Sequence, residues 1–97
     1  MPKLNFRRSH DLSLSEASTR LKSLVDEFVG KYGHLVKSVD WSSDGSSMKA
    51  KGKGFKGDFR VSSSSVEIDL DLGLVAIPIK GRIEQNVNDR LDSSFGG

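Results

Sequence analysis

The chain has 97 residues, enough for one hydrophobic core and too few for two independent ones. Its 15 lysines and arginines nearly balance 13 acidic residues, which is not the composition of a dedicated nucleic-acid-binding protein. The absence of cysteine excludes disulfides and thiolate metal sites, and no apolar run is long enough to span a membrane. We expect one cytoplasmic domain over residues 1–97, ordered over about 3–92, with a loose tail over 93–97, and no signal peptide.

The N-terminal third predicts a strand followed by a helix. Polar and apolar residues alternate over residues 3–7, which is typical of a strand. Ser13 and Glu16 fit a capping box, in which the Ser13 hydroxyl accepts a hydrogen bond from the Glu16 amide. Apolar residues then recur at helical spacing, and a pair of glycines within 30–33 marks the expected helix end. The apolar stripe comprises Leu14, Ala17, Leu21, Leu24, Val25 and Phe28.

Four strands joined by short turns are expected next. Serine- and glycine-rich segments mark the turns. In the last strand, apolar residues alternate strictly with acidic ones, which indicates one buried face and one solvated face. The expected strands cover residues 35–41, 47–53, 57–61 and 66–72.

A second helix is predicted over about residues 78–92. Pro78 suits a first helical turn, and apolar residues follow at every fourth position. The order is therefore β-α-β-β-β-β-α, an α+β fold with two layers. The last four strands form an antiparallel meander within a sheet of about five strands. Their outward residues are polar, so both helices should cover the same face.

The predicted outer face of the sheet is charged, and this charge has two interpretations. Opposite charges on neighbouring strands can stabilise one another, which we favour. Alternatively, the basic side chains could bind phosphate. Acidic residues one strand away and the lack of outward aromatic side chains argue against nucleic acid. The basic strip contains Lys49, Lys51, Lys53, Lys56 and Arg60, and its neighbours are Asp58, Glu67, Asp69 and Asp71, with Lys3 and Arg7 beyond them.

No catalytic, metal or cofactor site is predicted. Residues 52–57 spell a dinucleotide-binding glycine loop, but a strand follows where that motif requires a helix, so we expect a hairpin turn. His10 and His34 lie beyond opposite ends of the first helix, without zinc-site spacing. An enzyme that uses His10 together with Arg8 remains an alternative.

The apolar connection over residues 73–79 has two interpretations. It is either a buried link between strand and helix or a partly exposed apolar lip. Ala50, Gly52 and Gly57 are small residues that are expected to face inward. They either allow a helix to pack closely on the sheet or leave a pocket near Trp41. The candidate lip residues are Leu74, Val75, Ala76 and Ile77.

Several short motifs occur in an order that carries a family resemblance over residues 3–92. They are Arg8-Ser9-His10-Asp11-Leu12, Glu16-Ala17, Tyr32-Gly33, Trp41, Gly57, Leu72-Gly73-Leu74 and Lys80-Gly81-Arg82-Ile83-Glu84. The chain resembles the putative polyhydroxyalkanoic acid system protein family, which implies small bacterial proteins encoded near polyester-granule genes. The element order is also similar to a shortened helix-grip domain of the lipid-binding START type, in which the last helix crosses the sheet.

The sequence thus predicts a non-enzymatic accessory protein of polyhydroxyalkanoate storage. It would bind a hydrophobic surface or partner through the apolar connection, with the polyester granule or its proteins as partners. One alternative is a carrier of small hydrophobic ligands, using space near Ala50, Gly52 and Trp41. A second is a weak nucleic-acid binder that uses the basic strip.

Overall fold

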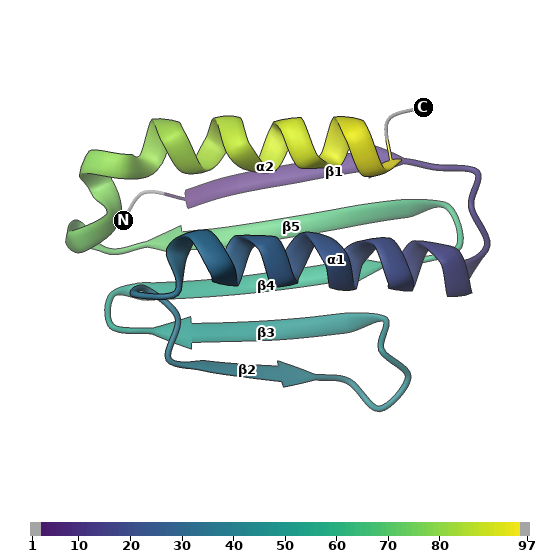
Figure 1. The fold of residues 1–97 in the computed structure, drawn as a ribbon, viewed down its shortest axis with the longest axis horizontal. Coiled ribbons are helices and arrows are strands. Elements are labelled where there is room, and N and C mark those ends of the chain that lie inside the picture. The colour runs from purple at the N-terminus through teal and green to yellow at the C-terminus, as the bar shows by residue number, and fades with distance from the viewer. Residues whose placement is uncertain (1–2, 96–97) are drawn as a thin grey trace.

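The computed structural model describes residues 3–95, with the backbone alone described at residues 74–76. It places five antiparallel strands in one open sheet and both helices on the same face, so the predicted α+β fold is confirmed (Figure 1). The elements are β1 (Lys3–Ser9), α1 (Leu14–Tyr32), β2 (Ser38–Trp41), β3 (Ser47–Gly52), β4 (Phe55–Val61), β5 (Ser65–Leu72), the 3-10 helix η1 (Leu74–Ile79) and α2 (Lys80–Phe95).

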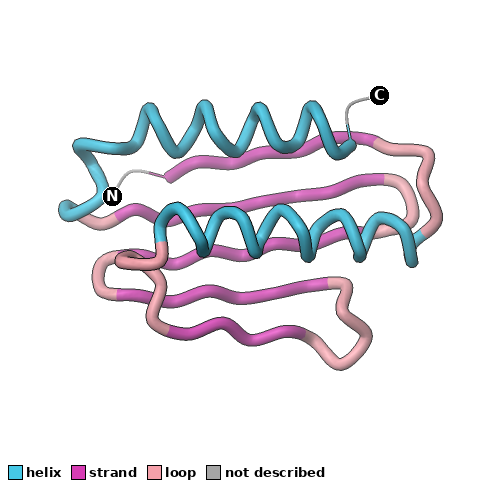
Figure 2. Tube along the Cα trace, in the orientation of Figure 1, coloured by secondary structure: helices cyan, strands magenta, loops and turns pink. Residues whose placement is uncertain are grey.

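The strand order in the sheet is β1-β5-β4-β3-β2. Strands β2 to β5 form the predicted meander, and β1 pairs beside β5 from Lys3↔Asp71 to Ser9↔Ser65. Because β1 and β2 lie at opposite edges, the segment that joins them must cross the sheet, and α1 covers the central strands on the way. Figure 2 shows the two helices side by side, with α2 lying along β1 rather than across the strands.

Helix α1 begins as its sequence predicts. The Ser13 hydroxyl accepts a hydrogen bond from the Glu16 amide at 3.2 Å, which satisfies one of the free N–H groups of the first turn. The predicted stripe is buried from Ala17 onward, whereas Leu14, at the first position, is 44% exposed. The apolar side of α1 therefore lies on the sheet over nearly its whole length.

The core joins both helices to one face of the sheet. Phe28 of α1 packs against Phe55 and Phe59 of β4, with ring centroids 5.8 and 5.9 Å apart. Ile68 of β5 is fully buried, while Asp69 beside it lies on the other face. This alternation confirms that the strands separate an apolar side from an ionic side. In α2, Ile83, Val87 and Leu91 are also buried, at the predicted spacing.

Two strand boundaries differ from the sequence prediction. Strand β2 begins at Ser38 rather than at residue 35, because the amides of Leu35 and Val36 donate hydrogen bonds back to the carbonyls of Tyr32 and Gly33, as in a turn. Phe55 was assigned to a turn, but it begins β4 and is 2% exposed because its ring packs on Phe28. The β3–β4 turn is thus Lys53 and Gly54, and Gly54 has the positive φ of 70° that glycine adopts without steric cost.

The last helix is also displaced from its predicted bounds. Pro78 lies inside η1, and α2 begins at Lys80. The helix continues to Phe95, so the loose tail predicted from residue 93 is helical as far as the structure describes it. Phe95 is 5% exposed and packs on His10, with ring centroids 5.7 Å apart. This burial extends the helix, and residues 96–97 lie outside the described part of the chain.

The close contact at Gly52 gives a stability prediction. A Cβ atom there would lie 1.6 Å from the Leu35 carbonyl oxygen, so Gly52→Ala should lower the free energy of unfolding by about 2–4 kcal/mol. Gly30→Ala is the matched control, because its Cβ meets nothing within 4 Å and alanine favours the helix by about 0.5–1 kcal/mol. Urea unfolding measures both, and equal stabilities would contradict the packing described.

Candidate functional site

The apolar connection between β5 and α2 begins at a contact between two glycine backbones. The Gly73 amide donates a hydrogen bond to the carbonyl oxygen of Gly54, in the β3–β4 turn. A Cβ on Gly73 would lie 2.6 Å from that oxygen and 2.8 Å from the Gly54 Cα, so only glycine permits this approach. The start of η1 is therefore fixed against the neighbouring hairpin, a contact that the local sequence pattern did not predict.

Helix η1 then presents apolar residues at one end of the molecule. Figure 1 shows it at the far left, beyond the ends of the strands. Ile77 is 43% exposed and Pro78 is also exposed, whereas Ile79 packs partly against the core. The side chains of the other three candidates, Leu74, Val75 and Ala76, lie outside the described residues. The connection is thus anchored at both ends and exposes apolar surface between them.

The small residues beneath the sheet do not leave the space that a ligand carrier would need. The Leu35 carbonyl lies against Gly52, and the rings of Phe55 and Phe59 fill the position beside Gly57. Ala50 is 1% exposed. Of the two interpretations of these small residues, the structure supports close chain approach.

Trp41 lies away from Gly52. It pairs with Met48 near the start of β3, whereas Gly52 ends that strand. The indole is half-buried and borders a surface hollow beside Lys22 of α1. The candidates Trp41, Ala50 and Gly52 are therefore distributed along β3 and its neighbour, and they do not line one site.

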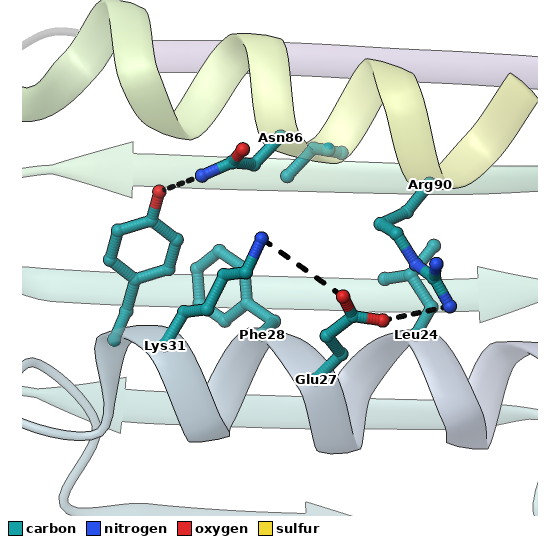
Figure 3. A pocket seen from close by; sticks show the side chains of 8 residues that line it. Leu24, Glu27, Phe28, Lys31, Asn86 and Arg90 are labelled. Carbon is teal, nitrogen blue, oxygen red and sulfur yellow. Dashed lines mark hydrogen bonds and ion pairs between the residues drawn. The ribbon is translucent and has the colours of Figure 1, made fainter.

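The two helices meet through a polar cluster, drawn in Figure 3. Glu27 lies between Arg90 Nη2 at 2.7 Å and Lys31 Nζ at 4.0 Å. Asn86 of α2 donates a hydrogen bond to the Tyr32 hydroxyl. The pocket beside these groups has a volume of about 10 Å³, room for about one water molecule. This cluster holds the helices together and offers no space for a larger ligand.

Arg8 and His10 are engaged in bonds that hold the fold. Arg8 donates to Asn88 Oδ1 at 2.8 Å and to Asp92 Oδ1 at 3.2 Å, which ties β1 to α2. The His10 ring is 8% exposed, and its Nδ1 accepts from the Leu12 amide at 3.1 Å. The ring proton is therefore on Nε2, which donates to the Ser62 carbonyl at 2.8 Å.

Both residues border an open hollow of about 700 Å³ at the C-terminal end of α2. A third side chain of this hollow, Arg20, donates to the Ser94 carbonyl at 2.8 Å. With both His10 nitrogens bonded to backbone groups, the ring can accept no proton from a substrate without losing a structural contact. The geometry favours a structural role for His10 and Arg8.

The outer face of the sheet carries the predicted ionic ladder. Arg60 of β4 bonds Asp69 of β5 at 2.6 Å and Glu67 at 3.4 Å. The Arg60 hydrogen bond, with a second from Asn5, holds the pKa of the Asp69 carboxyl below its ordinary value. The same bond to Asp69 raises the pKa of the Arg60 guanidinium. These groups are partly exposed, so the pair adds a modest amount to stability.

The basic strip is interleaved with carboxylates. Lys49 pairs with Asp58 on one side and with Asp40 of β2 on the other. Lys51 pairs with Lys56, and these two like charges face each other on β3 and β4. Asp40 was not predicted to be part of the ladder. Strand alternation could have placed it there, because Asp40 and Ser38 are two residues apart and therefore lie on the same face of β2. The strip is therefore mixed in sign near Lys49 and basic only toward the β3–β4 turn.

Residues 3–95 contain no cluster of three or more histidine or acidic side chains placed to hold a metal ion. No helix in this part of the chain has the length and apolar character to span a membrane.

Comparison with known proteins identifies a family. A family model described as putative polyhydroxyalkanoic acid system protein matches residues 4–95. The chain belongs to this family. The match reaches every helix and strand of the fold, and the family's description associates it with polyhydroxyalkanoic acid systems. No curated protein matches the chain.

The β2–β3 turn gives a prediction for acid titration. Hydrogen bonds from the Ser42 hydroxyl and from the amide and hydroxyl of Ser46 lower the pKa of Asp44 to about 2. Because this folded-state pKa lies below the unfolded value of about 3.9, Asp44 stabilises the fold above that pH. The contribution is lost as the pH falls toward 2. A carboxyl-carbon NMR titration measures the midpoint, and one near 4 would contradict these bonds.

The two His10 contacts predict graded effects of substitution. His10→Ala leaves the Leu12 amide and the Ser62 carbonyl without partners, so the free energy of unfolding should fall by about 2 kcal/mol. His10→Asn should cost less, because its Oδ1 occupies the position of Nδ1 and can still accept from Leu12. Thermal unfolding ranks the three proteins. An alanine variant as stable as the native chain would show that these bonds do not support the fold.

Proposed function

We propose that this protein is a non-enzymatic accessory protein of polyhydroxyalkanoate storage, acting in the cytoplasm, that binds the surface of the polyester granule through the η1 connection. The observation that carries the proposal is the apolar sequence from Leu74 to Ile79, placed at one end of the molecule with Ile77 and Pro78 exposed. Connections between elements are ordinarily polar, because they run over the surface. An exposed apolar connection is therefore a candidate contact surface.

Two further observations support binding rather than catalysis. The groups that an enzymatic mechanism would use, His10 and Arg8, are bonded within the fold. The space between helices and sheet is filled, as shown at Gly52 and Gly57, which favours an external surface over an internal ligand. The family's association with polyhydroxyalkanoic acid systems supplies the surface, a hydrophobic polyester.

A sedimentation experiment tests the proposal. Purified protein is mixed with lipid-free polyhydroxyalkanoate particles, which are then pelleted. We expect the native protein to pellet with the particles and Ile77→Asp to stay largely in solution, because a charge at the tip must be desolvated on contact.

Leu14→Asp is the matched control. Leu14 is 44% exposed against 43% for Ile77, and it lies at the opposite end of the molecule. Its substitution should leave binding intact, since an aspartate is also compatible with the first turn of a helix. If the native protein remains in the supernatant, or if both variants bind as it does, the η1 connection is not the contact surface.

A further inference from the structure

The end of the molecule that carries η1 is strongly basic. It is formed by the start of β1, the loop before β2, the β3–β4 turn with the strand residues beside it, the end of β5, η1 and the first turns of α2 (Figure 1). We call this surface the basic end. The strand register joins its parts, because Lys3 pairs with Asp71, Asp71 with Lys56 and Lys56 with Lys51. Its seven basic residues are Lys3, Lys37, Lys51, Lys53, Lys56, Lys80 and Arg82.

Charge at the basic end is not neutralised within the fold. Among residues 3–95, none of these seven side chains has a carboxylate oxygen within 4 Å. Two acidic residues lie beside them, Asp71 between Lys3 and Lys56 in the strand register and Glu84 in the second turn of α2. Six of the seven basic residues are exposed, and Lys80 is half-buried.

The opposite end has the reverse character. Its exposed carboxylates are Asp11, Glu16, Asp44 and Asp92. Two of its arginines are bonded within the fold, Arg8 to Asp92 and Arg20 to the Ser94 carbonyl. The long axis of the molecule, 37 Å, therefore separates a basic, apolar-tipped end from a more acidic one.

We infer that the basic end docks on an anionic lipid layer, with Ile77 and Pro78 entering the interface and the lysines contacting headgroup phosphates. Apolar residues surrounded by basic ones are the arrangement that holds proteins on negatively charged lipid surfaces. The inference rests on the proposed function, since it uses the same tip and names the chemistry of what that tip meets.

Nucleic acid shares the phosphate chemistry but fits this end less well. Proteins that hold single strands stack bases on exposed aromatic rings. The tyrosine and phenylalanine nearest the basic end, Tyr32 and Phe55, are 5% and 2% exposed, and the exposed ring in this part of the described chain is the imidazole of His34. The exposed side chains at the tip are aliphatic, which suits a lipid interface and offers a base nothing to stack on.

Vesicle sedimentation tests the inference with vesicles of phosphatidylcholine alone and of phosphatidylcholine with equimolar phosphatidylglycerol. We expect binding only to the phosphatidylglycerol vesicles, weakening as salt is added. Lys53→Glu/Arg82→Glu should lower the partition coefficient about tenfold or more. Lys22→Glu/Arg7→Glu has the same net charge, alters residues away from the basic end and should bind nearly as the native chain does.

The orientation is tested separately with a reporter. Ile77→Trp in a Trp41→Phe background should show a blue shift of fluorescence on the anionic vesicles, because residue 77 enters the interface. The native protein should show none, because Trp41 lies at the opposite end of β2 from the basic end.

Three results would overturn the inference. They are equal binding to both kinds of vesicle, equal losses for the two double variants, and tighter binding of a single-stranded oligonucleotide than of anionic vesicles at the same salt. A further outcome separates the two proposals. If the native protein and Lys53→Glu/Arg82→Glu bind lipid-free polyester particles equally and the native protein does not bind anionic vesicles, the lipid assignment is overturned and the proposed granule binding stays intact. Failure on both surfaces would overturn both.

Discussion

The packing of both helices on the same face of one sheet is the constraint on which the rest of this structure depends. It requires every second strand residue to be apolar, because these side chains face the helices, and the residues between them to be polar, because they face solvent. Ile68 and Asp69, adjacent on β5, show the two outcomes, one fully buried and the other bonded to Arg60 in the open. The covered face is filled by its own aromatic side chains. The open face is occupied by charged side chains, which are paired around Arg60 and unpaired toward the β3–β4 turn.

Because the apolar face is covered by the helices, apolar surface for recognition is available mainly at the connections between elements. Helix η1 differs from the other connections because it is apolar throughout, and the contact between Gly73 and Gly54 fixes where it begins. The other end of the sheet has serine-rich turns and the hydrogen-bonded Asp44. The two ends of this small molecule thus expose different side chains, apolar at η1 and polar at the opposite turns. The two faces of the sheet, in contrast, are determined by how the helices pack on it.

Sequence reasoning succeeded where the signal is local. The alternation in β5 and the capping pair Ser13 and Glu16 each depend on residues close together in the chain, and both were predicted correctly. It failed where a distant segment decides the outcome. The burial of Phe95 depends on His10 at the other end of the sequence, and the fit at Gly52 depends on a carbonyl from the loop before β2. The candidate Ile77 could be predicted from composition, but the charges gathered around it required the strand register.

Magnitudes explain why the proposed docking would need apolar and basic residues together at one end. Full burial of an isoleucine side chain is worth about 1.5–3 kcal/mol, and Ile77 is already partly covered in the free protein. That gain is smaller than the one from a single myristoyl chain, which by itself gives only marginal, reversible membrane binding. A basic residue near an anionic lipid surface contributes about 1 kcal/mol, so several cations at the basic end would exceed the apolar term. Attraction would bring this end to the surface and insertion of Ile77 would hold it there, so neither the exposed isoleucine nor the lysines would suffice alone.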